Sequence, residues 1–181
     1  AVPASAATKI SNGVACSKIN ATTKVGGFSY RCAKNVLVTN SKLTWLSFDC
    51  ITAMKQYTAA IKARKDFGDS NPQIEKLAAD IVTFQANLDS ATKSLEDIKV
   101  AAIKLKADLA AASATAKPKL TLELTEMNLA ISKLSASKTK LSSTVSNLKT
   151  QKALLESTPG QLEANVKDTK SMASVICYKG L

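Results

Sequence analysis

Two long runs of apolar residues, spaced alternately three and four positions apart, dominate the hydrophobic pattern of the chain. This spacing places the apolar side chains along one edge of an α-helix and is the heptad pattern of coiled coils. The sequence therefore predicts two long helices, each with one apolar edge. The first run is Ile74, Leu77, Ile81, Phe84, Leu88, Ala91, Leu95, Ile98, Ala102, Leu105 and Leu109, and the second is Leu120, Leu124, Met127, Ile131, Leu134, Lys138, Leu141, Val145, Leu148, Lys152 and Leu155.

The segment between the two runs, Ala110 to Lys119, is short and contains Pro118. If the chain doubles back there, Leu109 faces Leu120 and the other members of the two runs face each other in turn. Any two heptad runs can be matched in this way, so the short turn is the stronger evidence. We therefore expect a mainly α protein built on a long antiparallel two-helix coiled-coil hairpin.

The same register brings Cys50 within two positions of facing Cys177, so we expect a disulfide between them at the base of the hairpin. The arms are predicted at about residues 49–113 and 118–176, with breaks at 67–72 and 157–160, where Gly and Pro interrupt the pattern. These breaks fall opposite each other and predict a shared joint within the helical part, residues 49–181.

Residues 13–48 predict a small β module that follows an N-terminal tail, residues 1–12. Gly26-Gly27 between two short β-prone runs is a hairpin signal, and Val36–Val38 with Leu43–Leu46 suggests a second hairpin. The result is a meander of three to five strands that is too small to bury a large core. A disulfide between Cys16 and Cys32 would stabilise it by about 3 kcal/mol in the chain-entropy model.

Composition supports export and a thin core. Of the 181 residues only 4% are aromatic, which suits a coiled coil, and no apolar run is long enough to span a membrane. The first residues, Ala1 to Ala7, resemble the surroundings of a signal-peptidase site. Four cysteines, an even number, favour an oxidising compartment. We therefore expect a secreted, extracellular or cell-surface protein.

Several apolar residues fall outside the two runs and predict that part of the outer helical surface is apolar. Lys138 and Lys152, in contrast, occupy positions within the apolar run. Their long side chains can lie along the seam and carry the ammonium groups out to solvent. The alternative is that these lysines set the register of the two helices or face an acidic partner. Many apolar residues on a thin rod favour packing against other copies or against the β module. They are Val82, Val100, Ile103, Leu122, Leu129 and Leu154.

The sequence offers little catalytic chemistry. It has no histidine and no C-x-x-C spacing, and each cysteine has a disulfide partner in the predicted arrangement. Glu96-Asp97 is the only adjacent acidic pair, and neighbouring residues on a helix point in different directions. We therefore expect no enzyme activity and assign no catalytic, cofactor-binding or metal-binding residues.

Charge is the more informative property, because the formal net charge is +11 and no acid precedes Asp49. A second acid-free stretch, Met127 to Leu155, predicts an interaction surface for an anionic cell-wall polymer or another polyanion; the simpler interpretation is a solvated helical face. Sequence-specific nucleic-acid binding is disfavoured, because the chain has only two arginines, Arg31 and Arg64. The lysines of this stretch are Lys133, Lys138, Lys140, Lys149 and Lys152.

The β segment resembles a short cysteine module of actinobacterial secreted and cell-surface proteins. The matching positions are Gly13-x-x-Cys16-x-Lys18, Gly26-Gly27-x-x-Tyr30-x-Cys32 and Lys42-Leu43-x-Trp45, about one fifth of the chain. The resemblance implies export, a Cys16–Cys32 bridge and a location at or outside the cell envelope. The family usually has Gly where Ile19-Asn20 stands, which puts the first turn in doubt, and it carries no settled activity. The helical part resembles no family.

Together these features favour an extracellular structural protein whose copies associate laterally into a filament, layer or spike. The N-terminal tail is a second candidate contact, because the small predicted sheet is rich in edges to which a neighbour's tail could add as a strand. One alternative is a monomeric envelope-binding adhesin or spacer that uses its positive charge on anionic wall polymers. A second is a membrane-active helical hairpin, which the Ala-, Ser- and Thr-rich turn disfavours.

Overall fold

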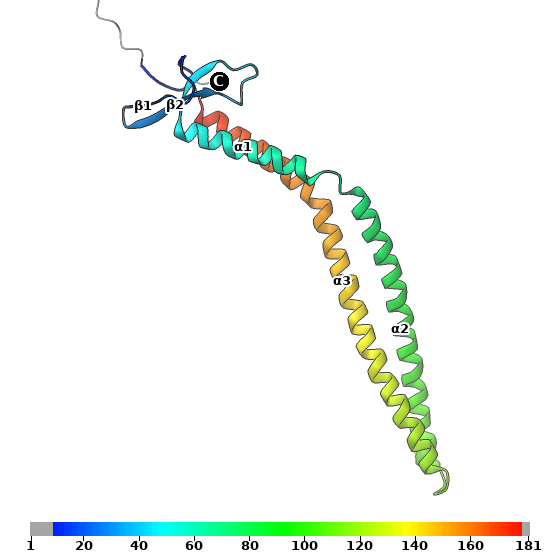
Figure 1. Ribbon diagram of the computed structural model, residues 1–181. Helices are drawn as coiled ribbons and strands as arrows, with labels where there is room; N and C mark the ends of the chain where they lie inside the picture. Colours follow the sequence, from blue (N-terminus) through cyan, green and yellow to red (C-terminus); the bar gives the residue numbers. More distant parts are fainter. Residues whose placement is uncertain (1–8, 179–181) are drawn as a thin grey trace, which may run out of the picture. The chain divides into compact units, whose positions relative to one another are not determined.

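The computed structural model describes residues 9–178 (Figure 1). The protein is mainly helical, with a small three-stranded antiparallel sheet near its N-terminus, as the sequence predicts. Its elements are β1 (Thr22–Val25), β2 (Phe28–Lys34), β3 (Leu43–Ser47), α1 (Phe48–Phe67), α2 (Asn71–Ala111) and α3 (Lys117–Ile176).

The chain divides into two compact units, and α3 contributes to both. The head unit consists of residues up to Gly68 together with residues from Ser157 onward, and the hairpin unit is Asp69–Glu156. The predicted N-terminal tail, residues 1–12, lies largely outside the described residues.

The head unit is built on a sheet of strand order β1-β2-β3. Val25 pairs with Phe28 across the first turn, where Gly26 and Gly27 both have positive φ values of 57° and 84°. Two consecutive residues with positive φ form the tight turn that suits twisted strands, and glycine adopts this conformation without a steric penalty. The first predicted hairpin is therefore confirmed.

The second predicted hairpin is partly wrong, because β3 pairs with β2 and Val36–Val38 is not a strand. Lys34 pairs with Leu43, so residues 35–42 form the connection. The buried Asn35 shapes this loop: its Oδ1 accepts a hydrogen bond from the Leu37 N–H at 2.9 Å, and its own N–H donates to Ser41 Oγ at 3.0 Å. A local side-chain bond of this kind competes with strand pairing, which β-propensity alone does not anticipate.

The Cys16–Cys32 disulfide fastens the N-terminal segment to the sheet, as expected. Cys32 lies on β2 opposite Trp45 of β3 and is fully buried. The Cys16 N–H donates to the carbonyl of Leu43 at 3.1 Å, so the segment before β1 also follows β3. The disulfide and the backbone bonds together order residues that have no strand of their own.

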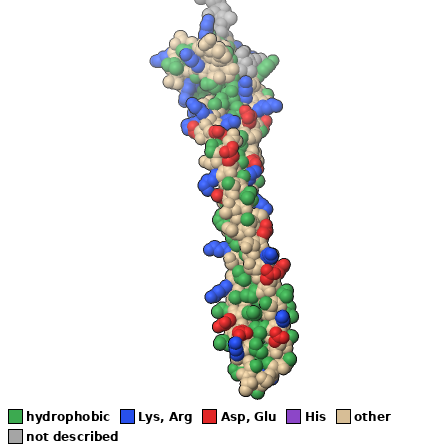
Figure 2. Space-filling model, turned by 90° about the vertical axis from the view of Figure 1, so that its right-hand side faces the viewer, with side chains coloured by type: hydrophobic (Ala, Val, Ile, Leu, Met, Phe, Trp, Pro, Cys, Tyr) green, Lys and Arg blue, Asp and Glu red, His purple; other side chains and the backbone are tan. Residues whose placement is uncertain are grey.

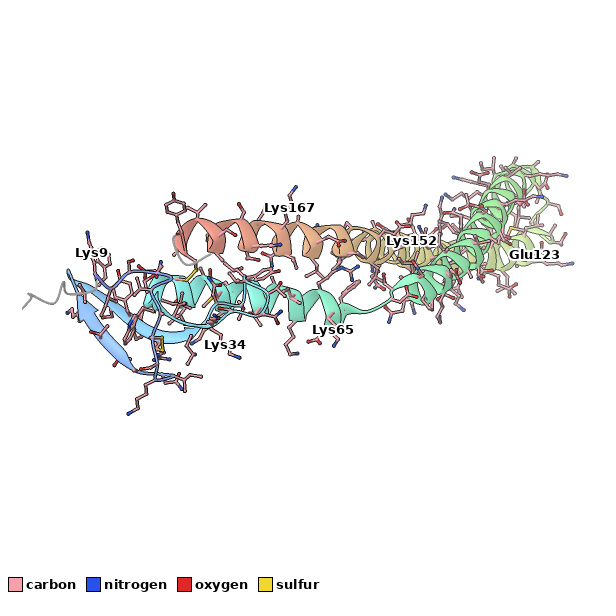
Figure 3. The ribbon with its side chains drawn as sticks, turned by 90° about the horizontal axis from the view of Figure 1, so that it is seen from above. Lys9, Lys34, Lys65, Glu123, Lys152 and Lys167 are labelled. Carbon is pink, nitrogen blue, oxygen red and sulfur yellow. A yellow bond between two sulfur atoms is a disulfide. The ribbon has the colours of Figure 1, made fainter. Side chains whose placement is uncertain are left out.

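In the head unit α1 packs beside the end of α3 (Figures 1 and 3). Ser47 caps α1 by accepting a hydrogen bond from the Cys50 N–H at 3.1 Å. The predicted disulfide between Cys50 and Cys177 joins the two helices, and both cysteines are fully buried. Leu46, Cys50, Met54 and Cys177 form the core that connects helices and sheet.

Small residues let these two helices approach closely. Ala53, Ala60 and Ala173 are all buried, and the α-carbons of Cys50 and Cys177 lie 4.9 Å apart. Cys50 thus lies directly against Cys177. The hairpin register alone would place Cys50 opposite the residue two positions after Cys177.

The hairpin unit consists of α2 and the first part of α3, which run antiparallel side by side (Figure 1). Every position of the two predicted apolar runs is buried or half-buried, including Lys138 and Lys152. Only Leu95, Ala102 and Val145 are buried in the strict sense, because a two-helix seam covers one side of each apolar edge. The turn, residues 112–116, falls within the predicted segment.

One of the two predicted breaks is wrong. α1 ends at Phe67 and Gly68 adopts a positive φ of 64°, so the break between α1 and α2 is present. However, α3 continues through Pro159 and Gly160 without interruption. Proline removes one N–H from the helix, but seam residues on both sides still hold α3 in helical form, so packing overrides a local preference that costs about 3 kcal/mol. The division between the two units nevertheless falls here, at Ser157.

Candidate interaction surfaces

The outer surface of the hairpin carries isolated aliphatic side chains, as the sequence predicts. All six predicted residues outside the seam are exposed. Figure 2 shows hydrophobic side chains gathered over the part of the hairpin near its turn. Four of the six belong to that part: Val100 and Ile103 on α2, and Leu122 and Leu129 on α3, with exposed fractions of 68%, 71%, 61% and 56%.

These four residues divide between the two outer faces of the hairpin. On α2 the outer face, opposite the seam, contains Val100 and is flanked by Ile103, whereas on α3 it contains Leu122 and Leu129, seven residues apart. The α2 and α3 outer faces point in opposite directions, because each helix turns its seam toward the other. The hairpin register places Val100 level with Leu129, and Ala107 level with Leu122.

The five lysines of the predicted interaction surface do not all lie on one face of α3. Lys133 and Lys140 are exposed on one flank of α3, and Lys149 is exposed on a different side of the helix, because heptad positions separate them by roughly half a turn. Lys138 and Lys152 are half-buried in the seam. An acid-free stretch of sequence covers all sides of a helix and therefore does not define a surface.

The two seam lysines emerge from the apolar edge to reach polar surroundings. Lys152 forms an ion pair with Glu156 one turn further along α3. Lys138 borders a shallow polar depression on the surface of α3 with Thr139, Ser142 and Ser146. Both placements match a lysine stem that lies along apolar surface with its ammonium group outside.

The positive charge is concentrated in the head unit. The hairpin unit, Asp69–Glu156, contains twelve lysines and ten acids and therefore has a net charge of +2. The head unit contains thirteen basic and four acidic residues, a net charge of +9. Seven of the ten hairpin acids lie before the turn, so α2 is close to neutral and the excess of lysine in this unit lies on α3. The basic surface is thus in the head unit, in agreement with the absence of acids before Asp49.

A cleft lies in the head unit between the sheet and α1, with a volume of about 480 Å³. Its apolar wall consists of Ala33 and Val36 from the sheet side and of Ile51, Met54 and Ala59 from α1. Asn20 and Thr58 add polar groups. The charged residues that line it are all basic: Arg31, Lys34, Lys55 and Lys62. The sequence gives no signal for this site, because its residues come together only when α1 packs against β2.

The four basic residues of the cleft differ in their partners. Lys62 is paired with Asp66 on α1. The Arg31 guanidinium lies 5.1 Å from the centre of the Phe48 ring, a cation–π distance, and its buried Nε has no hydrogen-bond partner within residues 9–178. Lys34 and Lys55 form no ion pair with any described residue. Figure 3 labels Lys34 beside α1.

Within residues 9–178, no cluster of acidic residues and cysteines has the arrangement of a metal site, and no helix is long and apolar enough to cross a membrane. The four cysteines are all in disulfides. Two disulfides indicate an oxidising, extracytoplasmic compartment. No family model and no curated protein matches the sequence, and no solved structure matches the fold.

Proposed function

We propose that this chain is an extracellular structural protein without enzyme activity, whose hairpins associate side by side into a layer or filament at the cell surface. The single observation that carries the proposal is the pair of apolar outer faces near the turn of the hairpin. The two disulfides and the resemblance of the β module to actinobacterial secreted proteins support the extracellular location.

The two outer faces are complementary when one copy is shifted sideways against another. The α2 face of one copy then meets the α3 face of its neighbour at the same level, which sets Val100 against Leu129 and Ala107 against Leu122. The same shift places Lys104 beside Glu126 and Asp97 beside Lys133, within one residue of equal level. All four charged residues are exposed and have no ion pair among the described residues. Contacts of this head-to-tail kind do not close, so they build an open array.

The magnitudes favour repeated weak contacts over a tight dimer. Full burial of the four aliphatic side chains contributes roughly 6 to 12 kcal/mol at about 1.5 to 3 kcal/mol each. Association costs on the order of 4 to 15 kcal/mol in lost translational and rotational freedom, so one such contact is weak. The net charge of +2 in the hairpin unit keeps repulsion between neighbouring hairpins small.

Charge reversal tests this arrangement. Lys104→Glu alone and Glu126→Lys alone each place like charges in contact and should reduce association, whereas the double variant restores opposite charges and should recover it. Sedimentation velocity over a concentration series, with electron microscopy of the concentrated samples, measures the outcome. Wild-type protein that remains monomeric throughout, or a double variant that associates no better than either single variant, would refute the proposed interface.

A matched pair of apolar substitutions distinguishes this interface from non-specific hydrophobic association. Leu129→Gln should weaken association, since Leu129 meets Val100 of the neighbour. Val82→Gln removes an aliphatic side chain that is even more exposed than Leu129. Val82 lies level with Asn147, where no apolar partner is present, so this change should have little effect. Equal losses in the two variants would contradict the predicted register.

The second candidate function is a monomeric envelope-binding adhesin or spacer, and the charge of +9 in the head unit favours it. Such a protein would bind anionic wall polymers through the head, and high salt would release it. Salt-sensitive binding to purified wall material by a protein that sediments as a monomer would select this alternative.

A further inference from the structure

The cleft between the sheet and α1 combines an apolar interior with uncompensated positive charge. Its volume of about 480 Å³ lies within the range of pockets that hold small molecules. Met54 forms part of its floor and is only 5% exposed, whereas Val36 is 56% exposed at its edge. The cleft therefore offers covered apolar surface inside and an apolar edge open to solvent.

Among residues 9–178, the only acid that forms an ion pair with a cation lining this cleft is Asp66, which pairs with Lys62. Lys34 at the end of β2 and Lys55 on α1 belong to different elements, and both line the cleft without an ion pair in the described part of the chain. An anionic group there would gain charge-assisted hydrogen bonds at little desolvation cost, since both ammonium groups are exposed.

We propose that the cleft binds a single amphipathic anion of the fatty-acid type, with its hydrocarbon chain against Ala33, Ile51 and Met54 and its carboxylate between Lys34 and Lys55. The apolar wall accounts for the hydrocarbon part and the two unpaired lysines account for the acid. A free single-chain molecule fits the volume, which is too small for the two chains and headgroup of a bilayer lipid. This site is independent of the hairpin contacts, so either proposal stands if the other fails.

Isothermal titration calorimetry with laurate, kept below its micelle concentration, tests the site. At the binding free energy per non-hydrogen atom that is usual for small ligands, a molecule of the size of laurate has a dissociation constant of about 1 mM or lower. Acetate, which lacks the chain, and dodecyltrimethylammonium, which reverses the charge, should both bind at least about tenfold more weakly. Equal binding of laurate and dodecyltrimethylammonium would overturn the proposal, and so would the absence of laurate binding.

Two variants locate the ligand in the cleft. The double variant Lys34→Gln with Lys55→Gln should weaken laurate binding by about tenfold or more, because it removes both charge-assisted contacts. Ala59→Glu places a carboxylate in the cleft and should have a similar effect. The matched controls are Lys167→Gln on α3 and Ala63→Glu on α1, both exposed and outside the cleft (Figure 3 labels Lys167).

All of the substituted side chains are exposed, so each variant should fold. Circular dichroism of each variant checks this. Laurate binding that is unchanged in both cleft variants would place the ligand elsewhere and refute the site. Losses of the same size in the controls would show a general charge effect and refute it equally.

Discussion

Replacement of Cys50 and Cys177 by alanine is expected to destabilise the head unit more than replacement of Cys16 and Cys32. The reason is the length of chain that each disulfide closes: the two cysteines are 127 residues apart in the first pair and 16 in the second. In the chain-entropy model these separations correspond to about 5 and about 3 kcal/mol. Cys50 and Cys177 are also fully buried in the core that joins sheet and helices, so loss of their sulfur atoms leaves a small cavity.

Trp45, the only tryptophan, gives a local measure of this effect. It lies on β3 opposite Cys32, so its fluorescence follows unfolding of the head unit. Urea denaturation monitored by this fluorescence, with far-ultraviolet circular dichroism for the helices, should give the larger shift in midpoint for Cys50→Ala with Cys177→Ala. The same variant should exchange amide hydrogens faster near the end of α3, which loses its attachment to α1.

If the urea midpoint of Cys50→Ala with Cys177→Ala shifts no more than that of Cys16→Ala with Cys32→Ala, the reasoning is refuted. That result would mean that packing between α1 and α3 already restrains the two chain segments without the covalent link. Wild-type protein in a reducing agent is the control, because it loses both disulfides and should be less stable than either variant.

Three further changes have defined expectations, each measured as a free energy of unfolding in urea. Gly160→Ala should stabilise the protein by about 0.5 to 1 kcal/mol, because Gly160 lies within α3 and a Cβ there meets nothing within 4 Å; a loss would indicate that the helix needs glycine at this position. Lys138→Leu should stabilise the hairpin by about 1 kcal/mol by filling a seam position, whereas Lys140→Leu, on the exposed flank, should not. Asn12→Ala should destabilise the head unit by about 1 to 3 kcal/mol, because it removes two hydrogen bonds. Asn12 Oδ1 accepts from the Ser47 N–H at 2.6 Å, and Asn12 Nδ2 donates to the Ile176 carbonyl at 3.2 Å. An unchanged free energy of unfolding would show that water replaces both bonds.

The proposed interface and the proposed cleft differ in how far the sequence could reveal them. The exposed residues of the hairpin follow from heptad positions alone, so the sequence predicts the exposure of Val100 and Leu129. Lys34 and Lys55 give no such signal, since they are far apart in sequence and belong to elements with different periodicities. Their common cleft exists only because α1 packs against β2.

The hairpin, its turn, the glycine turn of the sheet and the pairing of all four cysteines can be predicted from the amino-acid sequence. Helical periodicity and the steric demands of glycine are local properties, and the register of two matched apolar edges then brings Cys50 close to Cys177. Two features follow only from the folded structure: α3 continues through Pro159, and residues 35–42 form a loop around Asn35. At Pro159 helix packing offsets a local cost of a few kcal/mol, and at Asn35 short-range side-chain hydrogen bonds replace strand pairing; a hydrophobic pattern records neither.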